Sequence, residues 1–217
     1  TAYVSHKMKG EDIIRGVALK PCPLYAVNLE DPTKNAEFRH AEDLVSKERT
    51  LLYSFAGGYQ SDYLTDIRKK IFSMPHQRDH VCVQNTGDWH FNKVVYGGKQ
   101  NVQGDVWTEE SHTRKTKSYN ELLLSSRYTL APSGTGPNSI RLWEALGAGS
   151  IPVLLADTLD LPDHPLWEHS IVRIAEKDLH TLRERLDRID PAEEQRRREN
   201  CVRIYNHFRN NYANRGV

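Results

Sequence analysis

The sequence predicts an α/β fold in which a Rossmann-like parallel sheet is flanked by helices. Two observations support this class. Apolar segments of strand length alternate with segments of helical pattern from residue 50 to residue 190, as is typical of a parallel sheet with helices on both faces. A glycine-rich loop also joins one of these strands to a capped helix. The 217 residues are enough for one domain with a hydrophobic core.

Residues 1–49 are predicted to form a lead-in and linker segment. The apolar stretch 17–29 carries Pro21 and Pro23, which exclude a helix interior and a central strand. We therefore expect it to be extended. The charged stretch 30–49 suits a linker or a surface helix.

The predicted Rossmann-like domain covers residues 50–190. It starts with a buried strand at 50–55, a helix at 62–72 and a short strand at 81–83. The polar stretch 85–117, which contains several glycines, is predicted to form loops. Such long irregular stretches are uncommon unless they are functional or mobile.

The strongest pattern of strands and helices follows this stretch. Its predicted elements are, in order, a helix at 118–124, a strand at 128–131, a loop at 132–137, a helix at 139–148, a strand at 151–155, a strand at 170–175, a helix at 177–186 and a C-terminal helix at 191–217. Asn138 is a favourable N-cap for the helix at 139–148, and Gly149 is expected to end it.

The loop at 132–137 is the candidate anion site. It lies at the carboxyl end of a strand, where doubly wound sheets bind their ligands. Gly134 would let the backbone approach a ligand closely, and Ser133, Thr135 and Ser139 add hydroxyl groups. The first turn of the following helix offers unpaired N–H groups and the positive end of its dipole, which suit a diphosphate.

Arg141 and Glu144 lie three residues apart on that helix and therefore on neighbouring parts of one face. An arginine in a first turn opposes the helix dipole unless an anion lies nearby. Two interpretations stay open at this point: Arg141 binds an anion, or Arg141 and Glu144 form an ordinary surface ion pair.

The region from about residue 50 to residue 186 resembles the exostosin family of glycosyltransferases. That family carries a segment S-x-F-C-L-x-P-x-G, then S-x-R-x-x-E-A, then G-C-I-P-V and an acidic residue. The matching positions here are Ser126, Tyr128, Leu130, Pro132 and Gly134, then Ser139, Arg141, Glu144 and Ala145, then Gly149, Ile151, Pro152, Val153 and Asp157. A strand that ends in Phe55-Ala-Gly57, with Arg68 downstream, also fits.

The resemblance implies the C-terminal, donor-binding domain of an inverting GT-B enzyme, which transfers a sugar from a nucleotide diphosphate to a glycan or another hydroxyl acceptor. By this resemblance, Arg141 and Ser139 contact the diphosphate and Glu144 accepts hydrogen bonds from the ribose. Gly57 and Gly58 border the cleft. Residues 1–49 would then be a remnant of an N-terminal acceptor domain, and the second domain would lie outside this chain.

The departing nucleoside diphosphate builds negative charge on its bridging oxygen, which a preorganised cation, N–H groups or a metal must stabilise. The chain has no D-x-D motif, so we expect neither a metal nor another cofactor. Inverting transfer also needs a base for the acceptor hydroxyl. Asp157, Asp88 and His90 are weak candidates, and the other domain often supplies this residue.

Charge and cysteine content bear on partners and compartment. A net charge of +1 does not favour nucleic-acid binding, and no apolar run has the length of a membrane span. Cys22, Cys82 and Cys201 are too far apart for a metal motif, and free thiols are expected. Thr129 and Ser150 occupy the positions of the family's two motif cysteines. These features favour a cytoplasmic, bacterial-type protein over one in the Golgi lumen.

An alternative function is a non-catalytic nucleotide-binding or anion-binding module on the same fold, since fold does not determine function. An acceptor-side domain that carries a base would distinguish the enzyme from such a module.

Overall fold

A parallel sheet forms the centre of the molecule. The computed structural model describes residues 1–40, 43–77, 79–87 and 109–212. The sheet has five strands in the order β5-β4-β6-β7-β8, and every neighbouring pair is parallel. Its strands are β4 (Leu51–Gly57), β5 (Val81–Asn85), β6 (Ser126–Pro132), β7 (Ile151–Leu155) and β8 (Val172–Arg173). The predicted α/β class is confirmed.

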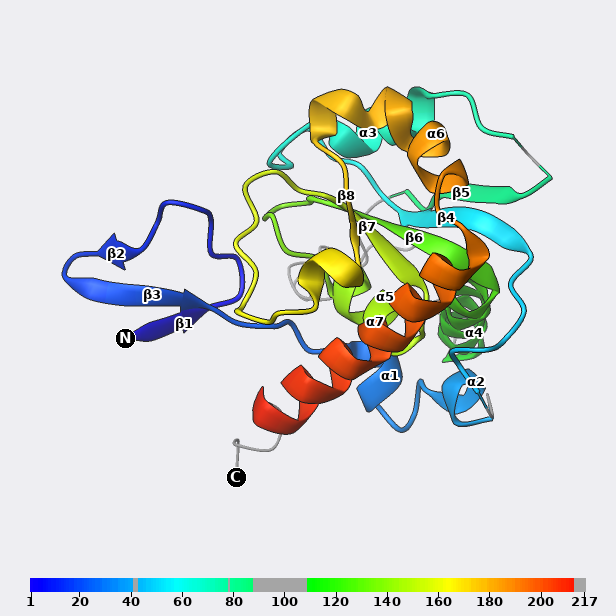
Figure 1. Ribbon diagram of the computed structural model, residues 1–217, viewed down its shortest axis with the longest axis horizontal. Coiled ribbons are helices and arrows are strands. Elements are labelled where there is room, and N and C mark those ends of the chain that lie inside the picture. Colours follow the sequence, from blue (N-terminus) through cyan, green and yellow to red (C-terminus); the bar gives the residue numbers. More distant parts are fainter. Residues whose placement is uncertain (41–42, 78, 88–108, 213–217) are drawn as a thin grey trace, which may run out of the picture.

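Helices cover both faces of this sheet (Figure 1). Helices α3 (Ile67–Ser73) and α6 (Leu182–Asp187) lie over one face, and α4 (Glu109–Ser125), α5 (Ile140–Gly147) and α7 (Pro191–Tyr212) lie over the other. Trp143 on α5 is buried edge-to-face against Phe208 on α7, with ring centroids 5.5 Å apart. No helix in the described part of the chain combines the length and the apolar character needed to cross a membrane.

The strand order reverses between β4 and β6. The chain passes from β4 through α3 to β5 on one side, and then returns to place β6 on the other side of β4. The loops that leave the carboxyl ends of β4 and β6 therefore diverge, and a crevice opens between them. This is the position at which open α/β sheets bind ligands.

The N-terminal segment forms a second, smaller sheet that projects from the body (Figure 1). It contains β1 (Ala2–Val4), β2 (Ile13–Ile14) and β3 (Val17–Pro21) in the order β1-β3-β2. Two short helices follow, α1 (Val27–Glu30) and α2 (Ala36–Arg39). The extended conformation expected for 17–29 is thus confirmed for its first part, but the exclusion of a central strand was wrong, because β3 lies between β1 and β2. Pro21 is tolerated because β2 pairs only with Val17 and Ala18, so this end of β3 has a free edge on that side.

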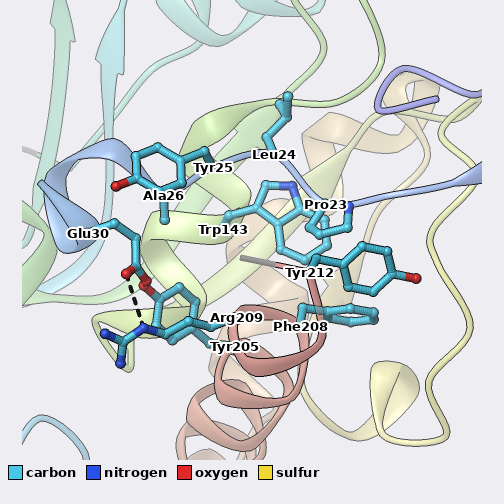
Figure 2. Close-up of a pocket in the computed structure, with 10 residues that line it drawn as sticks. All are labelled: Pro23, Leu24, Tyr25, Ala26, Glu30, Trp143, Tyr205, Phe208, Arg209 and Tyr212. Carbon is cyan, nitrogen blue, oxygen red and sulfur yellow. Dashed lines mark hydrogen bonds and ion pairs between the residues drawn. The ribbon is translucent and has the colours of Figure 1, made fainter. Parts of the chain in front are cut away.

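Residues just after β3 attach the lead-in segment to the body (Figure 2). Pro23, Leu24 and Tyr25 face Trp143 and Phe208 across a hollow of about 160 Å³. Beside it, the Glu30 carboxylate accepts hydrogen bonds from Tyr205 Oη and, at 3.0 Å, from Arg209 Nε. The lead-in segment is therefore held against α5 and α7. Its origin as a remnant of an acceptor domain stays a prediction.

Several predicted boundaries were wrong. Helix α4 starts at Glu109, although 85–117 was expected to form loops; this expectation was wrong for 109–117, and 88–108 lie outside the described residues. The first half of α4 is polar, so it carries no helical period of apolar residues. Helix α3 begins at Ile67 instead of residue 62. The predicted helix at 177–186 is a 3₁₀ helix, η3 (Glu176–Thr181), followed by α6.

Candidate functional site

A large cavity opens where the strand order reverses. Its volume is about 1110 Å³. It is bordered by the ends of β4 and β6, by the first turns of α5 and by one face of α4. The predicted binding residues that line it are Gly57, Gly58, Gly134, Thr135, Ser139, Arg141 and Glu144. The structure therefore brings together all of the predicted binding residues except Ser133.

Arg141 reaches from the first turn of α5 to the end of β4. Its Nη2 donates to the carbonyl oxygen of Ala56, and its Nη1 lies 3.4 Å from Ser139 Oγ. The guanidinium carbon is 4.8 Å from the centroid of the Phe55 ring. Arg141 Nε is buried and has no hydrogen-bond partner among the described residues. Glu144 is buried and its carboxylate oxygens accept hydrogen bonds from Asn28 and Tyr119, so the interpretation of Arg141 and Glu144 as a surface ion pair was wrong.

Arg68, on α3, is a second cation at the same place. Its Nε donates to the carbonyl oxygen of Ser133 at 2.8 Å and its Nη1 to that of Gly58 at 3.2 Å. The side chain is 8% exposed, and its guanidinium carbon lies 5.8 Å from the Phe55 centroid. Burial, together with the charge of Arg141, lowers the pKa of Arg68 to about 10. The like-charged pair therefore disfavours the empty cavity and favours one that holds an anion.

Two glycines make room for these arginines. A Cβ atom at Gly134 would lie 2.7 Å from Arg68 Nη2, and one at Gly57 would lie 3.0 Å from Arg141 Nη2. Since real Cβ atoms essentially never approach other atoms to 2.7 Å, a larger residue at Gly134 would force the end of the Arg68 side chain to move. The sequence suggested that Gly134 admits a ligand; in the structure it admits a cationic side chain that reaches the cavity.

Glu144 lies deeper in the cavity wall and is only 4% exposed. Its Oε1 accepts a hydrogen bond from the backbone N–H of Asn28 at 3.1 Å, and its Oε2 accepts one from Tyr119 Oη at 2.9 Å. Burial raises the pKa of the Glu144 carboxyl, while these two hydrogen bonds act in the opposite direction. The carboxylate therefore joins the lead-in segment and α4 to α5.

The start of α5 differs by one residue from the prediction. Ser139 is the N-cap, not Asn138, and its side chain makes no capping hydrogen bond. Asn138 Oδ1 instead accepts from the Ser139 N–H and from Trp143 Nε1, both at 2.9 Å. The end of the helix follows the prediction, because Gly149 has φ of 67° and its N–H bonds to the carbonyl oxygen of Leu146.

A family model described as the Exostosin GT47 domain matches residues 4–189. The chain belongs to this family. The match includes most of the lead-in segment, whereas the motifs noted above cover only about residues 50–186.

The relatives of the GT47 chain include an exostosin homolog and plant proteins named as probable glycosyltransferases. It is 23% identical over 192 residues to the "Exostosin-1 homolog" of Caenorhabditis elegans, covering 86% of this chain and 48% of that protein. It is 37% identical over 86 residues to the "Probable glucuronosyltransferase GUT1" of Oryza sativa subsp. japonica, and the match covers 39% of this chain and 19% of that protein. It is 38% identical over 86 residues to the "Probable beta-1,4-xylosyltransferase IRX10" of Arabidopsis thaliana, and the match covers 39% of this chain and 20% of that protein. The chain thus spans about half the length of the first relative and about a fifth of the plant proteins.

Two predicted residues of this GT47 domain lie away from the cavity lining. Ser133 is 1% exposed, and its hydroxyl lies 3.0 Å from Thr65 Oγ1 and 3.1 Å from Glu176 Oε1. Asp157, beyond the end of β7, accepts the N–H of Glu176 at 3.1 Å and 3.2 Å. It is absent from the cavity lining. The other base candidates, Asp88 and His90, lie outside the described residues.

Several residues that line the cavity had no assigned role in the sequence analysis. They are His6, Asn28, Arg68, Arg114, Lys115 and Tyr119. Arg68 and Tyr119 could have been found, since an arginine downstream of Gly57 and the run Tyr119-Asn-Glu-Leu-Leu both fit the family pattern. The others depend on tertiary contacts. No group of three or more His, Cys, Asp or Glu residues in the described ranges is arranged to hold a metal ion.

Proposed function

We propose that this GT47 chain binds a nucleotide-diphosphate sugar in the cavity at the ends of β4 and β6, and that it contributes to inverting transfer of the sugar. One observation carries the proposal. The guanidinium groups of Arg68 and Arg141 both lie near the Phe55 ring, and both donate hydrogen bonds to backbone carbonyl oxygens. Two guanidinium groups in this arrangement match the charge and the geometry of a diphosphate.

These residues would also stabilise the departing group. Negative charge grows on the bridging phosphate oxygen as the bond to the anomeric carbon breaks, and fixed cations and N–H groups near that oxygen lower the barrier. The hydrogen bond to Ala56 holds Arg141 in place. The hydrogen bonds to Ser133 and Gly58 hold Arg68 in place. Little reorganisation of either side chain is therefore needed. Transfer without a metal is part of this proposal, and magnesium dependence tests it.

Glu144 would bind the ribose of the nucleotide. Each carboxylate oxygen can accept more than one hydrogen bond. The bonds from Asn28 and Tyr119 therefore leave capacity for the ribose hydroxyls. They also hold the carboxylate in one orientation, so the ribose would meet an acceptor that is already in place.

The names of the relatives and the position of Asp157 bear on the acceptor and on the base. The relatives are named as glucuronosyltransferases and a xylosyltransferase, which supports a glycan acceptor. Among the described candidates only Asp157 remains as a base, and it lies outside the cavity lining. We therefore infer that a second domain supplies the base. The same observation favours the alternative, a module that binds nucleotides without catalysis.

Calorimetric titration tests the donor site directly. The wild-type chain and Arg141→Ala are titrated with UDP, GDP, ADP and CDP, first without and then with magnesium. Arg188→Ala, which removes an exposed arginine just after α6, is the matched control. We expect one nucleotide to bind without magnesium, with affinity lowered about tenfold or more in Arg141→Ala and unchanged in the control. Failure of all four to bind would overturn the donor-site assignment.

Sugar transfer distinguishes the enzyme from the binding module. A nucleotide sugar that carries the selected nucleotide is incubated with oligosaccharide acceptors, and the anomeric configuration of the product is determined by NMR. Transfer with inversion supports the proposal. Tight binding without transfer, in a chain joined to its acceptor domain, would support the alternative.

A further inference from the structure

A segment far from the glycine-rich loop in sequence lies against it in space. Residues 5–9, called the strap here, follow β1 and run along the loop after β7 (Figure 1). Lys9 N donates to the carbonyl oxygen of Thr158 at 2.9 Å, Asp160 N donates to that of Lys7 at 3.1 Å, and Met8 pairs with Leu159 in an antiparallel bridge. The strap is thus fixed to the body of the protein by backbone hydrogen bonds.

Lys7 anchors the strap further. Its side chain is 2% exposed, and Nζ lies 2.9 Å from Asp12 Oδ1 and 2.5 Å from Asp160 Oδ2. At the other end of the strap, the backbone carbonyl oxygen of Ser5 accepts a hydrogen bond from Asn138 Nδ2 at 2.6 Å. The residue between these two anchors, His6, consequently has little freedom to move away from the start of α5.

His6 is placed against the anion loop. A Cβ atom at Gly136 would lie 2.5 Å from His6 Nδ1, so the absence of a side chain at Gly136 is what allows the imidazole to rest there. His6 lines the same cavity as Arg68 and Arg141. His6 is an exposed residue, and neither of its ring nitrogens hydrogen-bonds to another residue of the described part. The ring is therefore held in position, with its polar atoms available to a ligand.

We propose that His6 is a further donor-site residue, whose imidazole donates a hydrogen bond to the diphosphate that Arg141 and the first turn of α5 bind. The inference rests on the proposed function and assigns a role in it to the N-terminal segment. An imidazolium here adds a third cation beside the two arginines. It would bind phosphate oxygens in the ground state and support the charge on the leaving group.

The electrostatic surroundings specify how this residue would respond to a ligand. The charged groups that line the same cavity are Arg68, Arg114, Lys115, Glu121, Arg141 and Glu144, and Lys7, Lys9, Asp157 and Asp160 lie along the strap. Partial burial lowers the pKa of His6 below its ordinary value of 6.5. His6 is thus mainly neutral in the empty protein at neutral pH. A diphosphate beside it would raise this pKa, so His6 would take up a proton when the nucleotide binds.

Calorimetry can detect that proton. The nucleotide selected from UDP, GDP, ADP and CDP is titrated, at about pH 7, into wild type and His6→Gln in two buffers that differ in ionisation enthalpy. His180→Gln, at an exposed histidine in η3, is the control. The difference between wild type and His6→Gln removes the contribution of the terminal phosphate of the nucleotide, which is the same in both.

We expect His6→Gln to bind the nucleotide about tenfold more weakly and to take up fewer protons than wild type, while His180→Gln matches wild type in both. A glutamine that only disturbed the strap would weaken binding without changing proton uptake, and this result would overturn the assignment. Equal affinity and equal proton uptake would also overturn it. Both outcomes would leave the proposed function intact, whereas a wild-type chain that binds none of the four nucleotides would overturn both.

Discussion

Thr129 Oγ1 and Ser150 Oγ lie 2.7 Å apart in the interior of the protein, where both side chains are almost fully buried. Thr129 belongs to β6, and Ser150 immediately precedes β7. These two positions carry the motif cysteines in the family pattern that the chain resembles. Their contact gives a physical reason why both cysteines are replaced together here, because each hydroxyl is the hydrogen-bond partner of the other. A reducing compartment remains a prediction.

Restoring both cysteines tests this relationship. We expect Thr129→Cys/Ser150→Cys to form a disulfide under mild oxidation, since the two side-chain termini already touch and disulfides need closely spaced Cβ atoms. A bridge that closes a loop of about twenty residues would stabilise the fold by about 3 kcal/mol. Thiol titration of the denatured protein and urea unfolding with and without reductant measure these effects. Thr129→Cys alone is the control, and a double variant that keeps all its thiols would contradict the prediction.

The fit between Gly134 and Arg68 predicts a coupling between two substitutions. In Gly134→Ala the new methyl group would displace the Arg68 guanidinium, which it would approach to 2.7 Å. We expect nucleoside diphosphate affinity to fall about tenfold in Gly134→Ala and by a similar factor in Arg68→Ala. The double variant should bind no more weakly than Arg68→Ala, because the guanidinium that the new methyl group displaces is already absent. Arg188→Ala, at an exposed arginine away from the cavity lining, serves as the control, and additive losses would contradict the coupling.

Glu144 predicts a specific dependence of stability on pH. Burial raises its pKa in the folded protein above the ordinary value of 4.5, so the folded state holds this proton more tightly than the unfolded state. The resulting stabilisation is fully present below the unfolded pKa and is lost as the pH rises through the folded pKa. The free energy of unfolding of wild type relative to Glu144→Gln should therefore be larger at about pH 5 than at about pH 8.

Urea unfolding of both proteins at the two pH values measures this difference. Glu121→Gln provides the comparison, since Glu121 lines the same cavity but is exposed. A relative stability of Glu144→Gln that stays constant between the two pH values would show that the buried carboxyl does not titrate in this range.

The strands and the glycine-rich loop were predictable because their signals are local. The residues of β6 and β7 that face the core form short apolar runs, and a glycine at the end of α5 adopts the positive φ that ends many helices. Arg141 and Glu144 share a helix face by spacing alone. These features need only neighbouring residues, so the sequence pattern identifies the strand, loop and helix that border the cavity.

The remaining features depend on contacts between distant parts of the chain. Arg68 and Ser133 are 65 positions apart, and Glu144 is bound by residues from both the lead-in segment and α4. The polar first half of α4 also has no apolar residues at helical spacing, so the sequence did not predict a helix there. Pairings of this kind follow from the topology of the sheet rather than from spacing, which is why Ser133 was placed in the site although its hydroxyl contacts Thr65 and Glu176 instead.

Arg49 is the clearest case of such a long-range role, and it leads to the last prediction. The sequence places it at the end of a charged linker, but its side chain is only 7% exposed. Its guanidinium donates to four carbonyl oxygens, those of Leu44, Leu123, Ser126 and Ala148, at distances of 2.6 to 2.9 Å. These carbonyls belong to the linker, to the ends of α4 and α5 and to the start of β6, so one side chain joins the segments that enter and leave the central strands.

We expect Arg49→Met to lower the free energy of unfolding by about 3–5 kcal/mol, because several buried carbonyl groups lose a charged donor at once. Arg49→Lys keeps the charge but offers a shorter reach and fewer donors, so it should lose less. Arg188→Met removes an exposed arginine paired with Glu184, for which a change of about 0.5 kcal/mol or less is expected. Urea unfolding compares the three. If Arg49→Met were as stable as Arg188→Met, the four carbonyl groups would have to find water or other donors, and Arg49 would not hold these segments together.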